Sequence, residues 1–289
     1  MIRLLMLTLT ANFTFVTLAA ADYLDVGDSK IYFESHGEGP TVIFMHDGLL
    51  HSEVWDGQLA AFSGEYRSIR YDRRGYGRSD TPTTPFSNEN DLLKLIDAND
   101  IDRAVLVGSS SAGGMAVNFA LKHPDRVSAL VLVGAVVDGL GFSDHFLQRN
   151  MNNTGTEEVG RIERWVADPW LVAPQNTVTK ARVRELLESN PHDLAFEKFQ
   201  LAYDYANLNP KSELALKRLH EIKVPTLIIT GSADIPDVHA HAGALEAGIQ
   251  GAKREVIADV GHLSYMEDPA AFNAVVLHFL SLNSSRISL

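Results

Sequence analysis

The stretch of sequence that decides the fold is VLVGSSSAGG, residues 105–114. It begins with a short apolar segment typical of a buried strand, passes through small residues, and enters a helical pattern that continues to Lys122. A serine on such a strand-to-helix turn, with small residues two positions before and after it, is the local pattern that exposes a nucleophilic hydroxyl. The sequence therefore predicts a nucleophilic serine at this turn.

Two serines in the turn satisfy the small-residue requirement. Ser110 has Gly108 before it and Ala112 after it, and Ser111 also has small residues at both positions. Taken alone, a serine-rich turn after a strand is more often a helix N-cap than a catalytic site. A catalytic role therefore requires partners elsewhere in the chain.

Candidate partners follow two later segments. Asp234 comes shortly after the apolar segment 226–230, and His262 lies in a loop farther along the chain. A serine, an acid and a histidine in this order correspond to a nucleophile, an orienting acid and a general base. We therefore predict that Ser110, Asp234 and His262 are the catalytic residues, with Asp237 as the alternative acid.

Short apolar runs and helical patterns alternate along the chain, which predicts an α/β fold with a mostly parallel, doubly wound sheet. The predicted strands are 41–45, 104–107, 129–133 and 226–230, and the predicted helices are 90–98, 112–122 and 269–282. Ligands of such sheets bind beyond the carboxyl ends of the strands. The residues that directly follow each strand are therefore the most informative ones for function.

The alternation stops after Val137 and resumes at Val224. We interpret residues 138–212 as a helical cap inserted into a core formed by residues 22–137 and 213–289. Most of its aromatic residues are expected to form the cap's own core. The aromatic side chains expected to reach a substrate pocket are Phe142, Phe146, Trp165 and Trp170.

Stabilisation of a developing oxyanion requires two backbone N–H groups. One is expected from Ser111, the residue after the nucleophile. The second is expected from the loop after strand 41–45, with Gly48 as the main candidate and Leu49 as the alternative.

The composition narrows the class of ligand. The formal net charge is −12 and no basic run is present, which argues against nucleic acid or an anionic membrane as a partner and favours a small molecule. The absence of cysteine excludes disulfides and thiolate metal sites. The histidines form no ligand set, because His239 and His241 would lie on different faces of a helix. No metal or other cofactor is expected, and the sequence does not indicate an oligomeric state.

The N-terminus has the parts of a secretory signal peptide. A basic start at Arg3 is followed by an uncharged, mostly apolar run and by Ala19, Ala20 and Ala21. Cleavage after Ala21 would export the protein to the periplasm or the medium. An uncleaved anchor is the alternative, but the threonines in the run disfavour permanent insertion.

Along nearly all of residues 22–289 the sequence resembles the α/β-hydrolase superfamily. The resemblance rests on the elements above together with YDRRGYGRSD at 71–80 and HPDRV at 123–127. It implies the helix register that selects Ser110 as nucleophile. The chain differs from the family pattern at Asp47 and Ala112, where the family usually has glycine, and Asp47 would place a negative charge beside the site.

The resemblance implies a serine hydrolase that forms an acyl-enzyme from a carboxylic ester or lactone. A small, uncharged and moderately apolar substrate is expected unless Arg149, Arg161 or Arg164 points inward to bind a carboxylate. A C–C bond hydrolase and a haloperoxidase-like enzyme would use the same triad and remain alternatives, as does a binding protein that retains the fold. A dehalogenase or an epoxide hydrolase would need aspartate in place of Ser110.

Overall fold

The computed structural model describes residues 20–154, 160–190 and 214–287. Eight strands form one sheet in the order β1-β2-β4-β3-β5-β6-β7-β8. Their bounds are β1 Ala20–Asp25, β2 Lys30–His36, β3 Thr41–Met45, β4 Arg67–Tyr71, β5 Ala104–Ser109, β6 Val127–Val133, β7 Thr226–Gly231 and β8 Lys253–Ile257. The β1–β2 and β2–β4 pairs are antiparallel, and all the other pairs are parallel.

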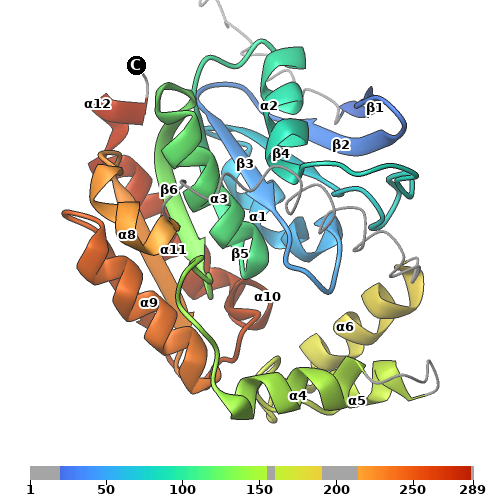
Figure 1. Cartoon of the computed structure of the whole chain (residues 1–289). Coiled ribbons are helices and arrows are strands. Elements are labelled where there is room, and N and C mark those ends of the chain that lie inside the picture. The colour runs from blue at the N-terminus through green and yellow to red at the C-terminus, as the bar shows by residue number, and fades with distance from the viewer. Residues whose placement is uncertain (1–19, 155–159, 191–213, 288–289) are drawn as a thin grey trace, which may run out of the picture.

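Helices cover both faces of the sheet (Figure 1). The α-helices are α1 Asp56–Phe62, α2 Asn88–Ala98, α3 Ser111–Lys122, α4 Asp144–Thr154, α5 Arg161–Ala167, α6 Thr177–Ser189, α8 Ala215–Arg218, α9 Pro236–Gly248, α10 Ser264–Glu267, α11 Pro269–Leu282 and α12 Ser284–Ile287. Short 3-10 helices occupy Ser52–Trp55, Pro124–Arg126 and Leu219–Glu221.

Two hydrophobic cores lie on opposite faces of the sheet. Successive side chains of a strand point to opposite faces. In β3, Ile43 and Met45 accordingly join the core with α2, α3 and α9, whereas Val42 and Phe44 join the core with α1 and α11. This double coverage explains why β3, β5, β6 and β7 are buried along their whole length and consist mostly of apolar residues.

The structure confirms the predicted fold class. Helix α11 has the predicted bounds, and α2 and α3 begin slightly earlier than predicted. The predicted strands correspond to β3, β5, β6 and β7. Strands β1, β2, β4 and β8 were not indicated by the apolar pattern.

Helices α4, α5 and α6 belong to the segment between β6 and β7. They lie side by side at one end of the sheet, with α4 and α5 at the bottom of Figure 1 and α6 above them at the right. Residues 155–159 and 191–213 of this segment lie outside the described residues. The boundaries expected for a cap therefore stay a prediction.

Residues 1–19 of the expected signal peptide also lie outside the described residues, whereas Ala20 and Ala21 begin β1. Within residues 20–154, 160–190 and 214–287, the helices are too short or too polar to cross a bilayer.

Candidate active site

Ser110 occupies a strained turn between β5 and α3. Its backbone has φ 55° and ψ −119°, a positive φ that side-chain-bearing residues rarely adopt. Gly108 makes the turn possible, because a Cβ at that position would lie 2.5 Å from the carbonyl oxygen of Ala112. Ser111 is the exposed first residue of α3, so the strained position belongs to Ser110.

Asp234 and His262 form a hydrogen-bonded pair at the same end of the sheet, after β7 and β8 respectively. The Asp234 Oδ2 atom lies 2.7 Å from His262 Nδ1, and Asp234 is buried. Because an ionised carboxylate only accepts hydrogen bonds, the proton of neutral His262 is assigned to Nδ1. The Nε2 atom is therefore left with a lone pair that can accept a proton.

The environment of His262 favours the protonated ring. Burial lowers its pKa, but the charge and hydrogen bond of Asp234 outweigh burial and raise the pKa above the ordinary histidine value. A raised pKa makes His262 a stronger base, which suits a group that must remove a proton from a hydroxyl.

Gly134, directly after β6, packs against this pair. Its φ is 52°, and a Cβ there would lie 2.8 Å from Cε1 of His262 and 3.5 Å from Oδ2 of Asp234. Only glycine fits at this position without displacing the imidazole. The sequence pattern did not single out Gly134, because its role depends on three strands that are distant in sequence.

The alternative acid, Asp237, has a different role. Its carboxylate accepts hydrogen bonds from the backbone N–H of Ser143 at 2.6 Å and from the Ser143 hydroxyl at 2.8 Å. Asp237 thus ties the start of α9 to the segment before α4, whereas Asp234 contacts the histidine.

The two expected oxyanion donors lie next to each other. A Cβ at Gly48 would lie 3.1 Å from the Ser111 hydroxyl oxygen. Among the described residues no protein acceptor is recorded for the N–H of Gly48 or of Ser111. Leu49, the alternative donor, is excluded because its N–H already donates to Asp47 Oδ1 at 2.6 Å.

Ser110, Ser111, Gly48 and His262 all line one cavity of about 200 Å³. Its walls are mainly apolar and include Val136, Phe146, Trp165, Leu171, Ile235 and Val238. Phe146 and Trp165 were expected in the pocket, but the expectation was wrong for Phe142 and Trp170. Phe142 instead stacks on Phe146 at 4.2 Å between ring centroids, and Trp170 packs edge-on against His145.

Arginines of the segment between β6 and β7 also reach the cavity. Arg149 and Arg161 line it, whereas Arg164 does not. The guanidinium of Arg149 forms a bidentate ion pair with Asp168, at 2.7 and 3.0 Å, and lies over the ring of Trp165 at 5.3 Å. The buried carboxylate of Asp168 therefore offsets the charge that Arg149 brings to the wall.

The loop that carries His262 is bonded to the segment between α5 and α6. The N–H of His262 donates to Trp170 O at 2.8 Å. Glu267 then joins the two segments through its carboxylate, which accepts from Gly261 N at 2.7 Å and from Ala173 N at 2.9 Å, and also from the side-chain amide of Asn176. Sequence reasoning missed Glu267, because its partners come from separate parts of the chain.

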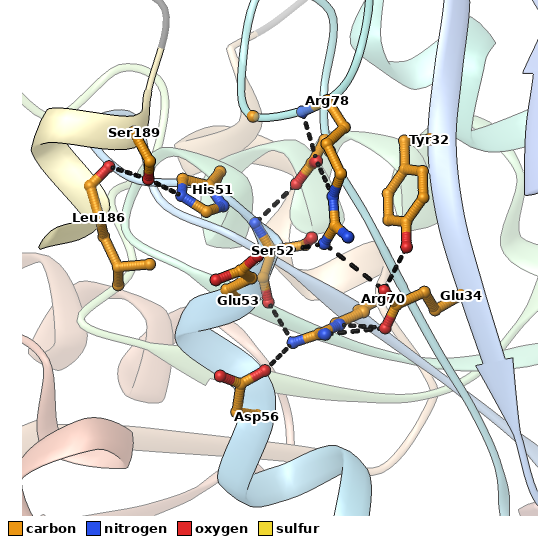
Figure 2. A network of polar contacts seen from close by, with 12 residues as sticks. Tyr32, Glu34, His51, Ser52, Glu53, Asp56, Arg70, Arg78, Leu186 and Ser189 are labelled. Atoms are coloured by element: carbon orange, nitrogen blue, oxygen red, sulfur yellow. Dashed lines mark hydrogen bonds and ion pairs between the residues drawn. The ribbon is translucent and has the colours of Figure 1, made fainter. Parts of the chain in front are cut away.

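A polar network anchors the loop that runs from Gly48 into the 3-10 helix Ser52–Trp55 (Figure 2). Ser52 N donates to Asp72 at 2.8 Å, and Ser52 O accepts from Arg70 at 3.3 Å. Arg70 also pairs with Glu34 of β2 at 2.7 Å. His51 Nε2 lies 3.1 Å from the Ser189 hydroxyl, so the same loop contacts the end of α6.

Comparison with known proteins gives consistent matches. A family model described as alpha/beta hydrolase fold matches residues 40–269. The 2-hydroxy-6-oxo-6-phenylhexa-2,4-dienoate hydrolase of Comamonas testosteroni is 29% identical over 277 residues, which cover 89% of this chain and 93% of that protein. The 2-hydroxy-6-oxononadienedioate/2-hydroxy-6-oxononatrienedioate hydrolase of Escherichia coli is 30% identical over an alignment that covers 91% of this chain and 96% of that protein.

Solved structures give the same fold. An N-acyl homoserine lactone degrading enzyme superposes with a TM-score of 0.72 at 28% identity and covers 89% of this chain and 100% of its own. The enol-lactonase from Burkholderia xenovorans also has a TM-score of 0.72, at 25% identity, and the match covers 90% of this chain and 100% of the lactonase chain. The relatives named here by activity are hydrolases or lactone-degrading enzymes.

Proposed function

Because this chain belongs to the alpha/beta hydrolase fold family, we propose that it is a serine hydrolase that cleaves carboxylic esters or lactones through an acyl-enzyme. The observation that carries the proposal is the strained turn of Ser110, which opens into the same cavity as His262, itself paired with Asp234. Strain at a residue that lines a cavity indicates a functional position.

The proposed reaction begins with attack of the Ser110 hydroxyl on the substrate carbonyl carbon. His262 Nε2 takes the hydroxyl proton, and Asp234 stabilises the resulting imidazolium through Nδ1–H. The carbonyl oxygen becomes an oxyanion that accepts from the N–H groups of Gly48 and Ser111. The leaving alcohol receives the proton from His262, and a water activated by the same residue then releases the acid.

A small, uncharged and moderately apolar acyl group fits the cavity best. Its apolar walls favour burial of hydrocarbon, and Asp168 neutralises the positive charge of Arg149, one of the two arginines in the wall. Two structural relatives are named for lactones, which supports a cyclic ester as one substrate class.

Cleavage of a C–C bond is the second candidate function. Two sequence relatives are named as hydrolases of unsaturated carboxylates that carry an oxo group, a dienoate in one case and a dienedioate or trienedioate in the other. The placement of Arg149 and Arg161 in the cavity wall would suit a substrate with a carboxylate. The same triad serves both reactions, so substrate preference decides between them.

The test is an activity screen over p-nitrophenyl esters of increasing acyl length, matched lactones, carboxylate-bearing esters and a vinylogous diketone. We expect the fastest turnover for short neutral esters and lactones. Ser110→Ala should abolish turnover and leave the fold intact, because it removes only one hydroxyl oxygen. Ser111→Ala is the matched control and should be mild, because the proposed role of Ser111 is through its backbone.

Each contrary outcome has a definite meaning. Preference for the carboxylate-bearing esters would overturn the neutral-substrate proposal, and cleavage of the diketone alone would establish the C–C hydrolase instead. Full activity of Ser110→Ala with an inactive Ser111→Ala would reverse the assignment of the nucleophile. Absence of any Ser110-dependent turnover would favour a binding protein.

A further inference from the structure

Asp47 stands at the start of the loop that carries Gly48, and both oxygens of its buried carboxylate are bonded. Oδ1 accepts from the backbone N–H of Leu49 at 2.6 Å and of Leu50 at 2.9 Å, and Oδ2 accepts from the Tyr265 hydroxyl at 3.3 Å. One side chain therefore holds the two N–H groups that directly follow Gly48. Bonds from N–H groups to an ionised carboxylate are among the stronger hydrogen bonds in proteins.

The carbonyl groups of the same loop are also hydrogen-bonded, by side chains other than Asp47. Asp47 O accepts from the Arg73 guanidinium and lies 2.8 Å from His46 Nδ1. His46 Nε2 accepts from Arg73 N at 3.0 Å, which assigns the proton to Nδ1 and makes that ring a donor to Asp47 O. The peptide before Gly48 is thus fixed in orientation.

The next two carbonyl groups are also bonded. Gly48 O accepts from the Tyr76 hydroxyl at 3.0 Å, and Leu49 O accepts from Asn190 Nδ2 at 3.1 Å. Within the described part of this loop, the polar backbone groups from Asp47 O to Leu50 N are therefore engaged, apart from the N–H of Gly48. That N–H belongs to the residue that lies against Ser111 at the cavity.

The geometry points to Asp47 as a positioning residue that fixes the N–H of Gly48 for an oxyanion. This inference rests on the proposed function. It also explains how a carboxylate is tolerated where negative charge develops: its oxygens are occupied by donors, and the Arg73 guanidinium lies against the same residue. Asp47 also lines the cavity, but both oxygens of its carboxylate are bonded to protein donors, so the role inferred for it is exerted through the loop.

The experiment compares Asp47→Ala, Asp47→Asn and Tyr265→Phe in the full chain. Asp47→Ala removes the acceptor of both N–H groups and should lower kcat by about 10- to 100-fold, somewhat less than the loss of an oxyanion donor itself, with KM changed by less than about threefold. Asp47→Asn keeps an oxygen for the two N–H groups and should restore most of the loss. Tyr265→Phe removes the hydroxyl that bonds Oδ2 but keeps the acceptor of the two N–H groups, and should leave kcat within about twofold.

Phenylboronic acid gives the second readout, because its tetrahedral adduct with a serine hydroxyl places an oxygen in the oxyanion site. Its inhibition constant should rise in Asp47→Ala in proportion to the loss of kcat. A preparation of a variant in which only a smaller fraction of the protein is folded would show a lower apparent kcat but an unchanged inhibition constant. If Asp47→Ala does not fold, the comparison of Asp47→Asn with Asp47→Ser, which has a shorter acceptor, should show the same ordering.

The outcomes separate this inference from the proposed function. Full kcat and an unchanged boronate affinity in Asp47→Ala, or in Asp47→Ser where Ala does not fold, while the wild type shows Ser110-dependent hydrolysis, would overturn the role of Asp47 alone. A loss in Asp47→Asn as large as in Asp47→Ala would also overturn it, because the charge and not the loop geometry would then matter. No Ser110-dependent hydrolysis by the wild type would overturn both.

Discussion

The ionisation of His262 sets the pH range in which the proposed chemistry can proceed. Asp234 raises the pKa of this ring against the opposing effect of burial, and only the neutral ring can take the proton of Ser110. Activity must therefore rise as pH increases through the raised pKa and fall as pH decreases below it.

We predict that the acid limb of a kcat/KM profile for a neutral ester has its midpoint above about 6.5, the ordinary histidine value. Asp234→Asn should move the midpoint to lower pH and reduce kcat by about 10³- to 10⁴-fold, as loss of the orienting acid does in other triads. A wild-type midpoint below that of Asp234→Asn would contradict the assigned pairing.

At the same scale, the sequence was sufficient for the residue types but not for their contacts. Ser110, Asp234 and His262 could be proposed because they occur in the order nucleophile, acid and base, with Ser110 and Asp234 each shortly after a predicted strand. The fit of Gly134 against the imidazole, with a Cβ position 2.8 Å from His262 Cε1, and the bonds of Asp47 to Leu49 and Leu50, at 2.6 and 2.9 Å, depend on close approach of atoms in the folded chain. No periodicity or spacing encodes such distances.

Glu267 determines how two structural elements meet. It ends α10 and joins the histidine loop to the segment between α5 and α6 through Gly261, Ala173 and Asn176. Burial raises the pKa of its carboxyl, and the charge of Asp234 raises it further against these hydrogen bonds. The buried Glu267 carboxylate therefore costs the protein some electrostatic stability, while its hydrogen bonds hold the loop that carries His262.

We predict that Glu267→Ala lowers kcat by about 10- to 100-fold, because a small displacement of a catalytic group is costly, and lowers the free energy of unfolding by about 2 to 3 kcal/mol. Glu267→Gln should have a kcat and a free energy of unfolding between those of the wild type and those of Glu267→Ala, because its amide N–H₂ group must face one of the N–H donors. Glu163→Gln is the control, because Glu163 pairs with Arg184 in solvent. Steady-state kinetics measure the change in kcat, and chemical denaturation measures the change in the free energy of unfolding. A Glu267→Ala protein that is destabilised but keeps the wild-type kcat would show that Glu267 has only a structural role.

Among the strands, burial on both faces decided what the sequence could predict. Strands β3, β5, β6 and β7 are buried throughout and appear as continuous apolar runs. Strand β8 lies at the edge and is largely exposed, with the sequence KREVI. Strand β4 is buried but contains Arg70, which is accommodated by Glu34 on the neighbouring strand (Figure 2). Because this ion pair places a charged residue in a buried strand, β4 lacks the continuous apolar run by which a buried strand is recognised in the sequence.

For the molecule as a whole, export remains a proposal that rests on the N-terminal sequence. Strand β1 pairs with β2 from Ala20 to Asp25, so cleavage after Ala21 would remove the pairs that Ala20 and Ala21 form and retain those from Asp22 onward. We predict that mass spectrometry of protein from an exporting host finds Asp22 as the first residue. An intact Met1 on active, soluble protein would contradict the signal peptide.

The bonds of α1 to the C-terminal helices have a consequence for synthesis of the chain. Gln58 donates to Tyr265 O at 3.0 Å and to Asn273 at 3.1 Å, across 207 and 215 residues of sequence. A ribosome-bound chain that ends before His262 already contains the serine turn but lacks its base and the partners of Gln58. Contacts of such long range form late in folding. If the triad acts as proposed, hydrolysis starts only after His262 has emerged and joined the serine turn, and a chain that ends before His262 is catalytically silent.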